Sequence, residues 1–412
     1  MTFDSIAADF SQHWLVYLSM PIVAAVIGYV TKVVAIYMMF EPIEFKGWAK
    51  WKLGWQGVVP SRAEQMARIS CRTMTGRLIQ PRDIFARIDP DRVAQEVEGP
   101  MLATVEGIIH EVMTQHQPGL WEAMPQALRA RLIARIQRES PAIIRQIFQQ
   151  MKDNIDNVFD LEEMVVSNLL KDKRLLNQIF TEVGHAEFNF IRYSGIVFGG
   201  IIGVVQAAVW IGTKSPIVLP IFGAFTGWFT DWLALQMIFR PQQPTKYFFG
   251  LFEWQGLFLK RKQQVSAEYG ALVAERILTP SAIMESVLTG PLSDRLVALV
   301  QKEVQAALDQ QAGLLKPFVV LAVGGAKYQA MKKSVSEQIM ARLPETFKHI
   351  EAYAAEAMDI RNTIVTKMQE LTAQEFEELL RPAFKQEEWK LIAVGAVLGF
   401  LIGEFQVLVM LH

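Results

Sequence analysis

The chain contains two copies of one apolar segment, and the copies carry opposite charges at their centres. Residues 21–42 read PIVAAVIGYVTKVVAIYMMFEP and residues 220–241 read PIFGAFTGWFTDWLALQMIFRP, an offset of 199 positions without a gap. Self-similarity at a fixed offset constrains the architecture before any other signal does. The repeating unit is about 200 residues long, which exceeds the length of a solenoid repeat and indicates a duplicated domain.

The duplication extends beyond this segment. Trp-Gln-Gly follows at 55–57 and again at 254–256, and a closing segment repeats at an offset of 200 positions. The closing segments carry glycines at four-residue steps: Gly195, Gly199 and Gly203 in one copy, and Gly395, Gly399 and Gly403 in the other. We therefore divide the chain into a first repeat, residues 1–211, and a second repeat, residues 212–412.

The composition indicates a mixture of membrane spans and water-facing helices. Of the 412 residues, 51% are hydrophobic and 20% are charged, and the mean hydropathy is +0.20. This is too apolar for an average soluble protein and too charged for a bundle of spans alone. The net charge of −1 gives no indication of nucleic-acid binding. The single cysteine, Cys71, excludes an intramolecular disulfide and any site built from several cysteines.

Four stretches are apolar over the length of about 20 helical residues that a bilayer requires. They are residues 14–40, 190–211, 216–239 and 390–411. The blocks between them, 41–189 and 240–389, place apolar residues at three- and four-residue steps, which predicts helices and no strands. Prolines at 81, 90, 100, 118, 125 and 141 are expected to divide the first block into shorter helices.

Each repeat therefore reads as span, large block, span. Because each repeat crosses the membrane twice, both copies have the same orientation, related by a pseudo-twofold axis along the membrane normal. We predict an all-α integral membrane protein with four transmembrane helices, two large helical extramembrane domains and parallel pseudo-twofold symmetry.

Basic residues indicate which side of the membrane the blocks occupy. Those flanking the spans on the block side are Lys46, Lys50, Lys52, Arg174, Lys246, Lys260, Arg261, Lys262, Arg381 and Lys385. On the other side we find Lys214 alone. The positive-inside rule then places the blocks in the cytoplasm and both termini outside, in a bacterial inner membrane.

The segments that follow spans one and three combine aromatic and basic residues, as membrane-surface segments do. The aromatic residues are Trp48, Trp51 and Trp55 in one copy, and Tyr247, Phe248, Phe249 and Trp254 in the other. We expect Trp55, Trp254, Arg62 and Arg261 to be interfacial anchors. The alternative is a hydrophobic plug beneath the bundle.

Lys32 and Asp231 occupy equivalent positions, each ten residues before the proline that ends its span. At about 1.5 Å per residue this is near the middle of the bilayer, where a lone charge costs about 3 kcal/mol. An ion pair across the axis would offset most of that cost. We therefore expect spans one and three to meet through Lys32–Asp231.

A second charge swap, Glu41 and Arg240, predicts another pair at the inner membrane boundary. Thr31 and Thr230 are expected to satisfy nearby polar groups, and the glycine stripes to pack helices closely. The pairs have two interpretations. One is a register lock between the repeats, which we favour. The other is a cation or proton path lined by Asp231 and Thr230.

No motif indicates catalysis. His110 and His116 are six residues apart, so one helix would not present both to a metal. The sequence has no Walker A, Gly-x-Ser-x-Gly or His-Glu-x-x-His pattern. We therefore expect no enzyme activity, no cofactor and no metal site.

The pattern G-x-x-T-x-x-x-A-x-x-M-x-F-x-P runs from Gly28 to Pro42 and again from Gly227 to Pro241. Together with Trp-Gln-Gly and the segment HAEFNFIRYSGIVFGGIIGVVQ, it resembles the domain of unknown function 445 family, the YjiN/YheB-like bacterial proteins. The resemblance implies membrane embedding with helical blocks between spans, and it brings no established biochemistry. Members of that family often carry Asn where this chain has Lys32 or Asp231.

These observations favour a non-enzymatic membrane scaffold or lipid-handling protein whose partners are membrane lipids. That function predicts apolar faces on residues 90–188 and 290–385 that exceed what a closed bundle buries. The alternative is a small transporter or channel at the repeat interface around Asp231 and Lys32, which predicts a polar cavity at mid-membrane reaching both sides. Four spans are few for a transporter, and the sequence leaves homo-oligomer formation open.

Overall fold

The computed structural model describes residues 3–48, 53–247, 250, 252–312, 324–381 and 388–411. Its contacts divide the chain into two compact units. Unit 1 comprises Met1–Met74, Asn168–Leu272 and Val365–His412, and unit 2 comprises Thr75–Ser167 and Val273–Ile364. Both units contain segments from both predicted repeats. The units are defined by contacts in space, whereas the repeats are defined by similarity along the sequence.

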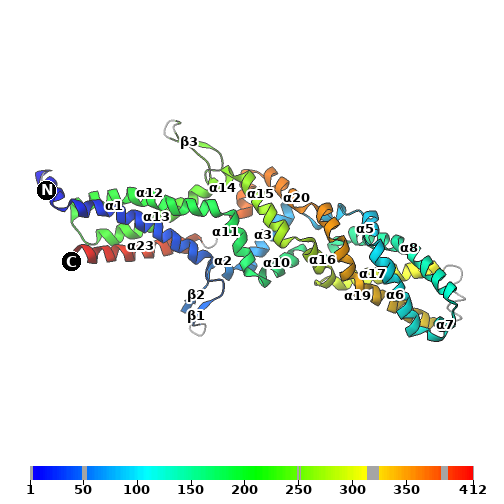
Figure 1. The fold of residues 1–412 in the computed structure, drawn as a ribbon. Coiled ribbons are helices and arrows are strands. Elements are labelled where there is room, and N and C mark those ends of the chain that lie inside the picture. The colour runs from blue at the N-terminus through cyan, green and yellow to red at the C-terminus, as the bar shows by residue number, and fades with distance from the viewer. Residues whose placement is uncertain are drawn as a thin grey trace. The chain divides into compact units, whose positions relative to one another are not determined.

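Unit 1 contains the four long apolar helices (Figure 1). They are α1 (Phe3–Phe40), α12 (His185–Thr213), α13 (Val218–Phe239) and α23 (Glu388–Leu411). Their parts that are long and apolar enough to cross a membrane are Tyr17–Phe40, His185–Thr213, Val218–Phe239 and Glu388–Leu408. The prediction of four apolar spanning helices is confirmed. Helix α12 begins at His185, five residues before the predicted span. The prediction began later because the first residues of the helix include polar side chains, which an apolar-length criterion excludes.

The apolar helices pack in two close pairs, α1 with α12 and α13 with α23. A Cβ atom added at Gly28 would lie 2.2 Å from the carbonyl oxygen of Gly195, and one added at Gly227 would lie 2.0 Å from that of Gly395. Small residues at such contacts let helix backbones approach closely in lipid. The start of α1 and the end of α23 lie at the same end of this bundle (Figure 1).

Two short hairpins follow α1 and α13 and correct the prediction that the chain forms no strands. Strands β1 (Lys46–Trp48) and β2 (Leu53–Trp55) pair antiparallel, as do β3 (Thr245–Tyr247) and β4 (Phe252–Trp254). Lys46 faces Trp55 in the first hairpin, and Thr245 faces Trp254 in the second. Strands of three residues are too short to show an alternating pattern, which explains why the sequence did not indicate them.

Short helices complete unit 1 and continue into unit 2. They are α2 (Val58–Ser61), α3 (Ala63–Arg77), α10 (Leu161–Lys171), α11 (Lys173–Val183), α14 (Leu257–Lys260), α15 (Lys262–Leu272), α20 (Ile360–Glu370) and α21 (Ala373–Leu380). Helices α3, α10 and α20 each have residues in both units.

Among the residues that the structure describes, the regular elements of unit 2 are all helices. Its elements are α4 (Pro81–Ala86), α5 (Pro90–Glu96), α6 (Glu98–His116), α7 (Pro118–Ala123), α8 (Gln126–Asp153), α9 (Ile155–Val158), the π-helix η3 (Val273–Ile277), α16 (Pro280–Thr289), α17 (Ser293–Ala312) and α19 (Gly325–Met358). The long helices α6, α8, α17 and α19 contact one another.

The prolines of the first block have two different effects. Pro81, Pro90 and Pro118 are the first residues of helices, where the missing N–H would be unpaired in any case. Pro100 lies in the first turn of α6, and Pro125 immediately precedes α8, so these two prolines also mark helix starts. Pro141 instead lies in the middle of α8 and does not divide that helix, contrary to the prediction.

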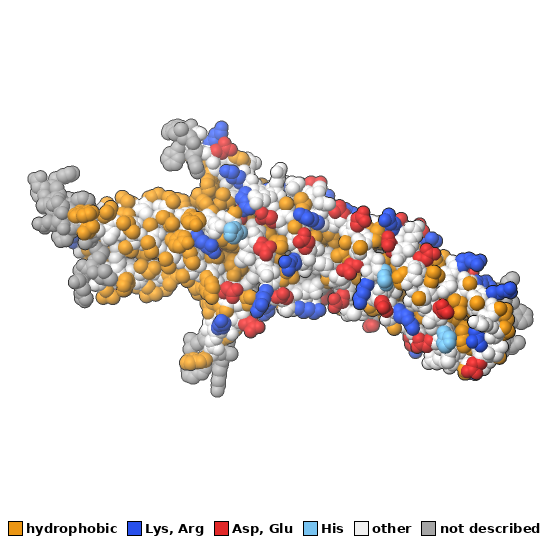
Figure 2. Space-filling view, viewed as in Figure 1, with side chains coloured by type: hydrophobic (Ala, Val, Ile, Leu, Met, Phe, Trp, Pro, Cys, Tyr) orange, Lys and Arg blue, Asp and Glu red, His pale blue; other side chains and the backbone are white. Residues whose placement is uncertain are grey.

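The surfaces of the two units differ in chemistry (Figure 2). Hydrophobic side chains dominate the visible face of the four apolar helices, whereas Lys, Arg, Asp and Glu are dispersed over unit 2. This contrast fits a bundle that contacts lipid tails and a unit that contacts water.

Candidate functional site

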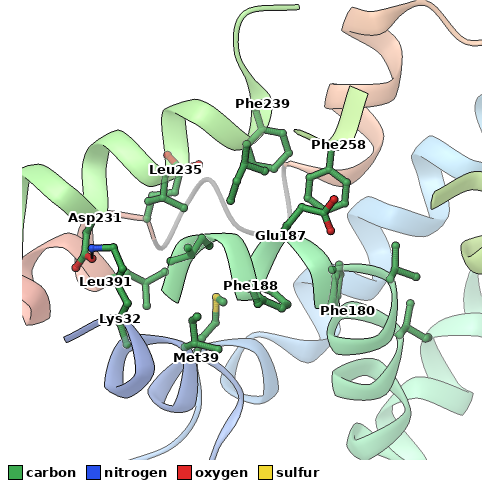
Figure 3. Close-up of a pocket in the computed structure, with 18 of the residues that line it drawn as sticks. Lys32, Met39, Phe180, Glu187, Phe188, Asp231, Leu235, Phe239, Phe258 and Leu391 are labelled. Atoms are coloured by element: carbon green, nitrogen blue, oxygen red, sulfur yellow. Dashed lines mark hydrogen bonds and ion pairs between the residues drawn. The ribbon is translucent and has the colours of Figure 1, made fainter. Parts of the chain in front are cut away.

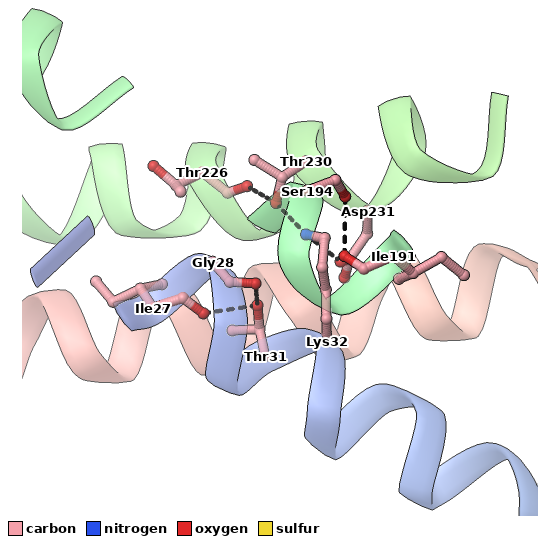
Figure 4. A network of polar contacts seen from close by, with 9 residues as sticks. All are labelled: Ile27, Gly28, Thr31, Lys32, Ile191, Ser194, Thr226, Thr230 and Asp231. Carbon is pink, nitrogen blue, oxygen red and sulfur yellow. Dashed lines mark hydrogen bonds and ion pairs between the residues drawn. The ribbon is translucent and has the colours of Figure 1, made fainter. Parts of the chain in front are cut away.

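The centre of the bundle in unit 1 holds a buried polar network (Figure 4). Lys32 of α1 is 0% exposed and Asp231 of α13 is 5% exposed, and Lys32 Nζ lies 3.0 Å from Asp231 Oδ1. Lys32 Nζ also donates to the Thr230 hydroxyl oxygen at 2.6 Å. Charge-assisted hydrogen bonds of this kind offset part of the desolvation that burial imposes on both ions.

The two threonines have different roles. The Thr31 hydroxyl donates to the carbonyl oxygen of Ile27 at 2.8 Å, within its own helix. The Thr230 hydroxyl donates in the same way to the carbonyl oxygen of Thr226 at 2.7 Å, and it also accepts from Lys32 (Figure 4). Thr230 is therefore a member of the ion-pair network, whereas the hydroxyl of Thr31 bonds to its own helix.

One atom of the network lacks a hydrogen bond. Asp231 Oδ2 is buried and has no hydrogen-bond partner among the described residues. It faces Gly395, where an added Cβ would lie 2.0 Å from it. At the equivalent glycine, Gly195, an added Cβ would lie 2.9 Å from Lys32 Cδ. These two glycines make room for the charged side chains as well as for helix packing, a role that the sequence analysis did not foresee.

The remaining glycines of the stripes lie against backbone. An added Cβ would lie 2.4 Å from the Ala24 carbonyl oxygen at Gly199, 2.5 Å from Pro21 Cα at Gly203, 2.1 Å from the Gly223 carbonyl oxygen at Gly399, and 2.6 Å from the Leu219 carbonyl oxygen at Gly403. No side chain larger than hydrogen fits at these positions without moving a helix.

The second charge swap has a different geometry. Glu41 and Arg240 lie just beyond Phe40 and Phe239, the last residues of α1 and α13. Within the described part of the chain no hydrogen bond or ion pair joins Glu41 to Arg240. Arg240 is exposed and Glu41 is half-buried. The chain turns into the hairpins at these positions, so helix geometry no longer brings the two side chains together.

The predicted interfacial anchors have different surroundings. Trp55 Nε1 donates to the Met38 carbonyl oxygen at 3.2 Å, and the Trp254 ring lies 5.7 Å from that of Phe190. Both tryptophans are half-buried, and Arg62 is exposed. Six predicted surface residues lie outside the described part of the chain: Lys50, Trp51, Lys52, Phe248, Phe249 and Lys385.

Arg261 is the partner of a buried carboxylate. Its guanidinium donates to both oxygens of Glu187, at 2.8 and 2.9 Å. Glu187 is 1% exposed and lies in the first turn of α12. The sequence analysis missed this pair because the residues are 74 positions apart and no motif connects them.

A narrow cavity extends from the Lys32–Asp231 pair to Glu187 and Tyr269 (Figure 3). Its volume is about 70 Å³, and its walls are otherwise mainly apolar side chains such as Met39, Phe188 and Phe239. Burial raises the pKa of the Tyr269 phenol, with a smaller contribution from nearby Cys71, so the phenol stays protonated at neutral pH. The space admits a few water molecules, each of which requires at least about 10–15 Å³.

Unit 2 contains a larger cavity of about 290 Å³ between α6, α8, α17 and α19. Among its 25 described lining residues, one is charged, Arg342, and three carry a hydroxyl group: Thr104, Ser140 and Thr346. Each of these hydroxyls donates to a carbonyl oxygen four residues earlier in its own helix. Arg342 donates to Glu111 at 3.1 Å. The rest of the wall is hydrocarbon or thioether.

The described residues contain no cluster of three or more His, Cys, Asp or Glu side chains that could hold a metal ion. Neither cavity contains an arrangement of nucleophile and base.

Comparison with known proteins gives partial matches. A UPF0754 membrane protein of Bacillus cereus (strain AH187) is 29% identical over 147 residues, which cover 34% of this chain and 38% of that protein. UPF0754 membrane proteins of Bacillus anthracis (strain A0248) and Bacillus thuringiensis (strain Al Hakam) match with the same identity and coverage. These relatives are membrane proteins. The match spans 38% of the length of these relatives. They therefore contribute one piece of information, that similar proteins are membrane proteins of an uncharacterised family.

No protein-family model matches the chain, and no solved structure matches it. The resemblance to the domain of unknown function 445 family is therefore not supported by a family model. The relatives are membrane proteins by name, and this chain has four helices long and apolar enough to cross a membrane.

Proposed function

We propose that the protein is a non-enzymatic lipid-handling membrane protein that binds an acyl chain in the cavity of unit 2. The observation that carries this proposal is the apolar cavity between α6, α8, α17 and α19. None of the four candidate spans belongs to unit 2, so this cavity is separate from the helices that would contact the bilayer core.

The size of the cavity argues for an occupant. Protein interiors are normally packed to the density of organic crystals. The cavity of about 290 Å³ is partly open to solvent, so without an occupant its apolar wall is left incompletely packed or in contact with water. An engineered apolar cavity of about 150 Å³ stays dry and binds benzene. A ligand that fills this space would recover stability through apolar contacts.

The chemistry of the wall selects the occupant. Because Thr104, Ser140 and Thr346 already donate within their own helices, the wall requires no hydrogen bonds from a ligand. A flexible hydrocarbon chain fits such a wall, since each buried methylene contributes about 0.8 kcal/mol. Membrane lipids are the source of acyl chains for a protein anchored by four apolar helices.

Photo-crosslinking of the full chain tests this proposal. The protein in nanodiscs containing a phospholipid with a diazirine in its acyl chain should crosslink at Ile143 or Ile147 of α8, which line the cavity. The lipid-facing surfaces of α1 and α13 should also crosslink and provide an internal positive control. Absence of crosslinks in unit 2, with crosslinks in the spans, would contradict the proposal.

A cavity-filling pair of substitutions sharpens the test. Val304→Phe with Val335→Phe should abolish the α8 crosslinks, leave those of the spans unchanged and preserve the melting temperature, because the rings occupy existing space. The matched control is Glu337→Phe, at an exposed position of the same helix α19. Crosslinks at α8 that survive filling while the protein stays folded would show that the lipid binds elsewhere.

A second candidate function, a proton or small-cation path, is favoured by the unpaired Asp231 Oδ2 beside the narrow cavity of unit 1. The uncharged double variant Lys32→Gln with Asp231→Asn removes both charges together, so it leaves no unpaired ion. Proton flux into proteoliposomes should be lost in this variant if the path exists. Flux equal to that of the unmodified protein, or no flux in either, would eliminate this candidate.

A further inference from the structure

The two hairpins have a distinctive position within unit 1. Strand β1 begins six residues after the last residue of α1, and β3 begins six residues after the last residue of α13. They project from opposite sides of the bundle, at the end away from the start of α1 and the end of α23 (Figure 1). Both therefore leave the spans at the level where a bilayer surface would lie.

The outer strands expose a mixture of aromatic and basic side chains. Trp48 is 75% exposed and Tyr247 is 44% exposed. Lys46 and Lys246 are exposed beside them. Large exposed aromatic rings are unfavourable in water, whereas Trp and Tyr are enriched at the membrane–water interface. A lysine near an anionic leaflet is attracted by the negative surface potential of that leaflet.

The base of each hairpin is fixed to the end of its span. Gln56 Nε2 donates to the Ile43 carbonyl oxygen at 2.8 Å, and Gln255 Nε2 donates to that of Gln242 at 3.2 Å. A Cβ added at Gly57 or Gly256 would lie 2.7 Å from the carbonyl carbon of Phe40 or Phe239. The orientation of each hairpin is thus set by direct contact with the end of a membrane helix.

The outer strands β1 and β3 have no layer packed over them within the described part of the chain. All residues of β1 and β3 are exposed, and each sheet has two strands. A two-stranded hairpin alone is marginally stable in water, and it normally requires packing against another surface. The surface continuous with the ends of α1 and α13 is that of the bilayer itself.

We infer that the hairpins β1–β2 and β3–β4 rest on the headgroup region of an anionic bilayer and hold the spans at a fixed depth. Trp48 and Tyr247 insert at the interface, and Lys46 and Lys246 pair with anionic headgroups. This surface is independent of the acyl-chain cavity in unit 2, and either can exist without the other.

Site-directed spin labelling of the full chain in nanodiscs tests the inference. In a Cys71→Ser background, labels at Trp48→Cys and Tyr247→Cys should collide more often with oxygen, which concentrates in lipid, than with a water-soluble nickel chelate. The control label is Glu106→Cys, at an exposed position of α6 in unit 2. This label should collide more often with the nickel chelate than with oxygen. The two hairpins are labelled in separate proteins, so failure of one variant to fold leaves the other as the test.

Charge reversal identifies the lipid. Lys46→Glu with Lys246→Glu should move the label at position 48 toward water in discs containing phosphatidylglycerol, and have no effect in discs of phosphatidylcholine alone. Labels at 48 and 247 that are as accessible to the nickel chelate as the label at 106 would overturn the inference. Dipolar broadening between labels of two copies, without lipid contact, would overturn it in favour of hairpin pairing between chains.

Discussion

At the scale of single residues, one buried ion pair joins two helices of the bundle. Lys32 and Asp231 are both buried and are joined at 3.0 Å. Removing one partner of a buried pair leaves an uncompensated charge, which lowers the free energy of unfolding by about 3–5 kcal/mol. The intact pair can contribute almost nothing to that free energy. We therefore expect the pair to contribute more to specificity of packing than to net stability.

This balance predicts a rescue by charge exchange. Lys32→Asp or Asp231→Lys alone places two like charges together and should lower the melting temperature of the full chain in detergent, by the equivalent of about 3 kcal/mol or more. The double exchange should recover much of this loss, because Gly195 and Gly395 provide space beside both positions. A double exchange as unstable as either single one would show that the pairing does not stabilise the bundle.

The sequence contained unequal amounts of information about these residues. Equivalent positions in a duplicated chain, together with the energy of a lone mid-span charge, predict Lys32 beside Asp231; what the pair does stays a prediction. The Glu187–Arg261 pair has no such signal, because only the fold brings α12 and the end of α14 together. Glu41 and Arg240 lie one residue beyond the ends of α1 and α13, as the predicted spans implied, and no hydrogen bond or ion pair joins them among the described residues.

At the scale of elements, close helix pairing depends on particular glycines. Gly395→Ala should destabilise the bundle by about 1–3 kcal/mol, because the added methyl group would meet Asp231 Oδ2 at 2.0 Å and force it to move. The matched control is Gly200→Ala on α12, where the added Cβ would have a neighbour no closer than 3.9 Å, the Ala25 Cβ. There the better helix propensity of alanine should leave stability unchanged or slightly raised.

Thermal unfolding of the two variants in the same detergent distinguishes these effects. Equal melting temperatures for Gly395→Ala and Gly200→Ala would mean that the contact at Asp231 can relax without loss. A Gly195→Ala variant, whose methyl group would lie 2.9 Å from the flexible Lys32 side chain but 2.1 Å from the Gly28 carbonyl oxygen, tests the backbone contact separately.

Elements were predictable where a long pattern defines them. The four spans follow from continuous apolar length, and the amphipathic helices of unit 2 follow from their periodicity. The hairpins could not be predicted, because three residues have no measurable period. The cavity of unit 2 could not be predicted either, since periodicity identifies an apolar face but not whether neighbouring helices fill the space against it.

At the scale of the whole molecule, the arrangement of charges predicts one orientation in the membrane. The turn between α12 and α13 carries Lys214, whose Nζ lies 5.1 Å from the centroid of the Tyr17 ring. The opposite end of the bundle adjoins Lys46 and Lys246 on the hairpins. The positive-inside rule therefore predicts that this turn lies outside and that unit 2 lies in the cytoplasm.

Cysteine labelling in spheroplasts tests this orientation. In a Cys71→Ser background, Thr213→Cys in the exposed turn should react with a membrane-impermeant maleimide in intact spheroplasts. Glu106→Cys on α6 should react only after permeabilisation, because in the predicted orientation unit 2 lies in the cytoplasm, which the maleimide cannot reach. The reverse pattern would place unit 2 outside and contradict the positive-inside assignment. Labelling of both positions in intact spheroplasts would mean that the bundle does not cross the membrane four times.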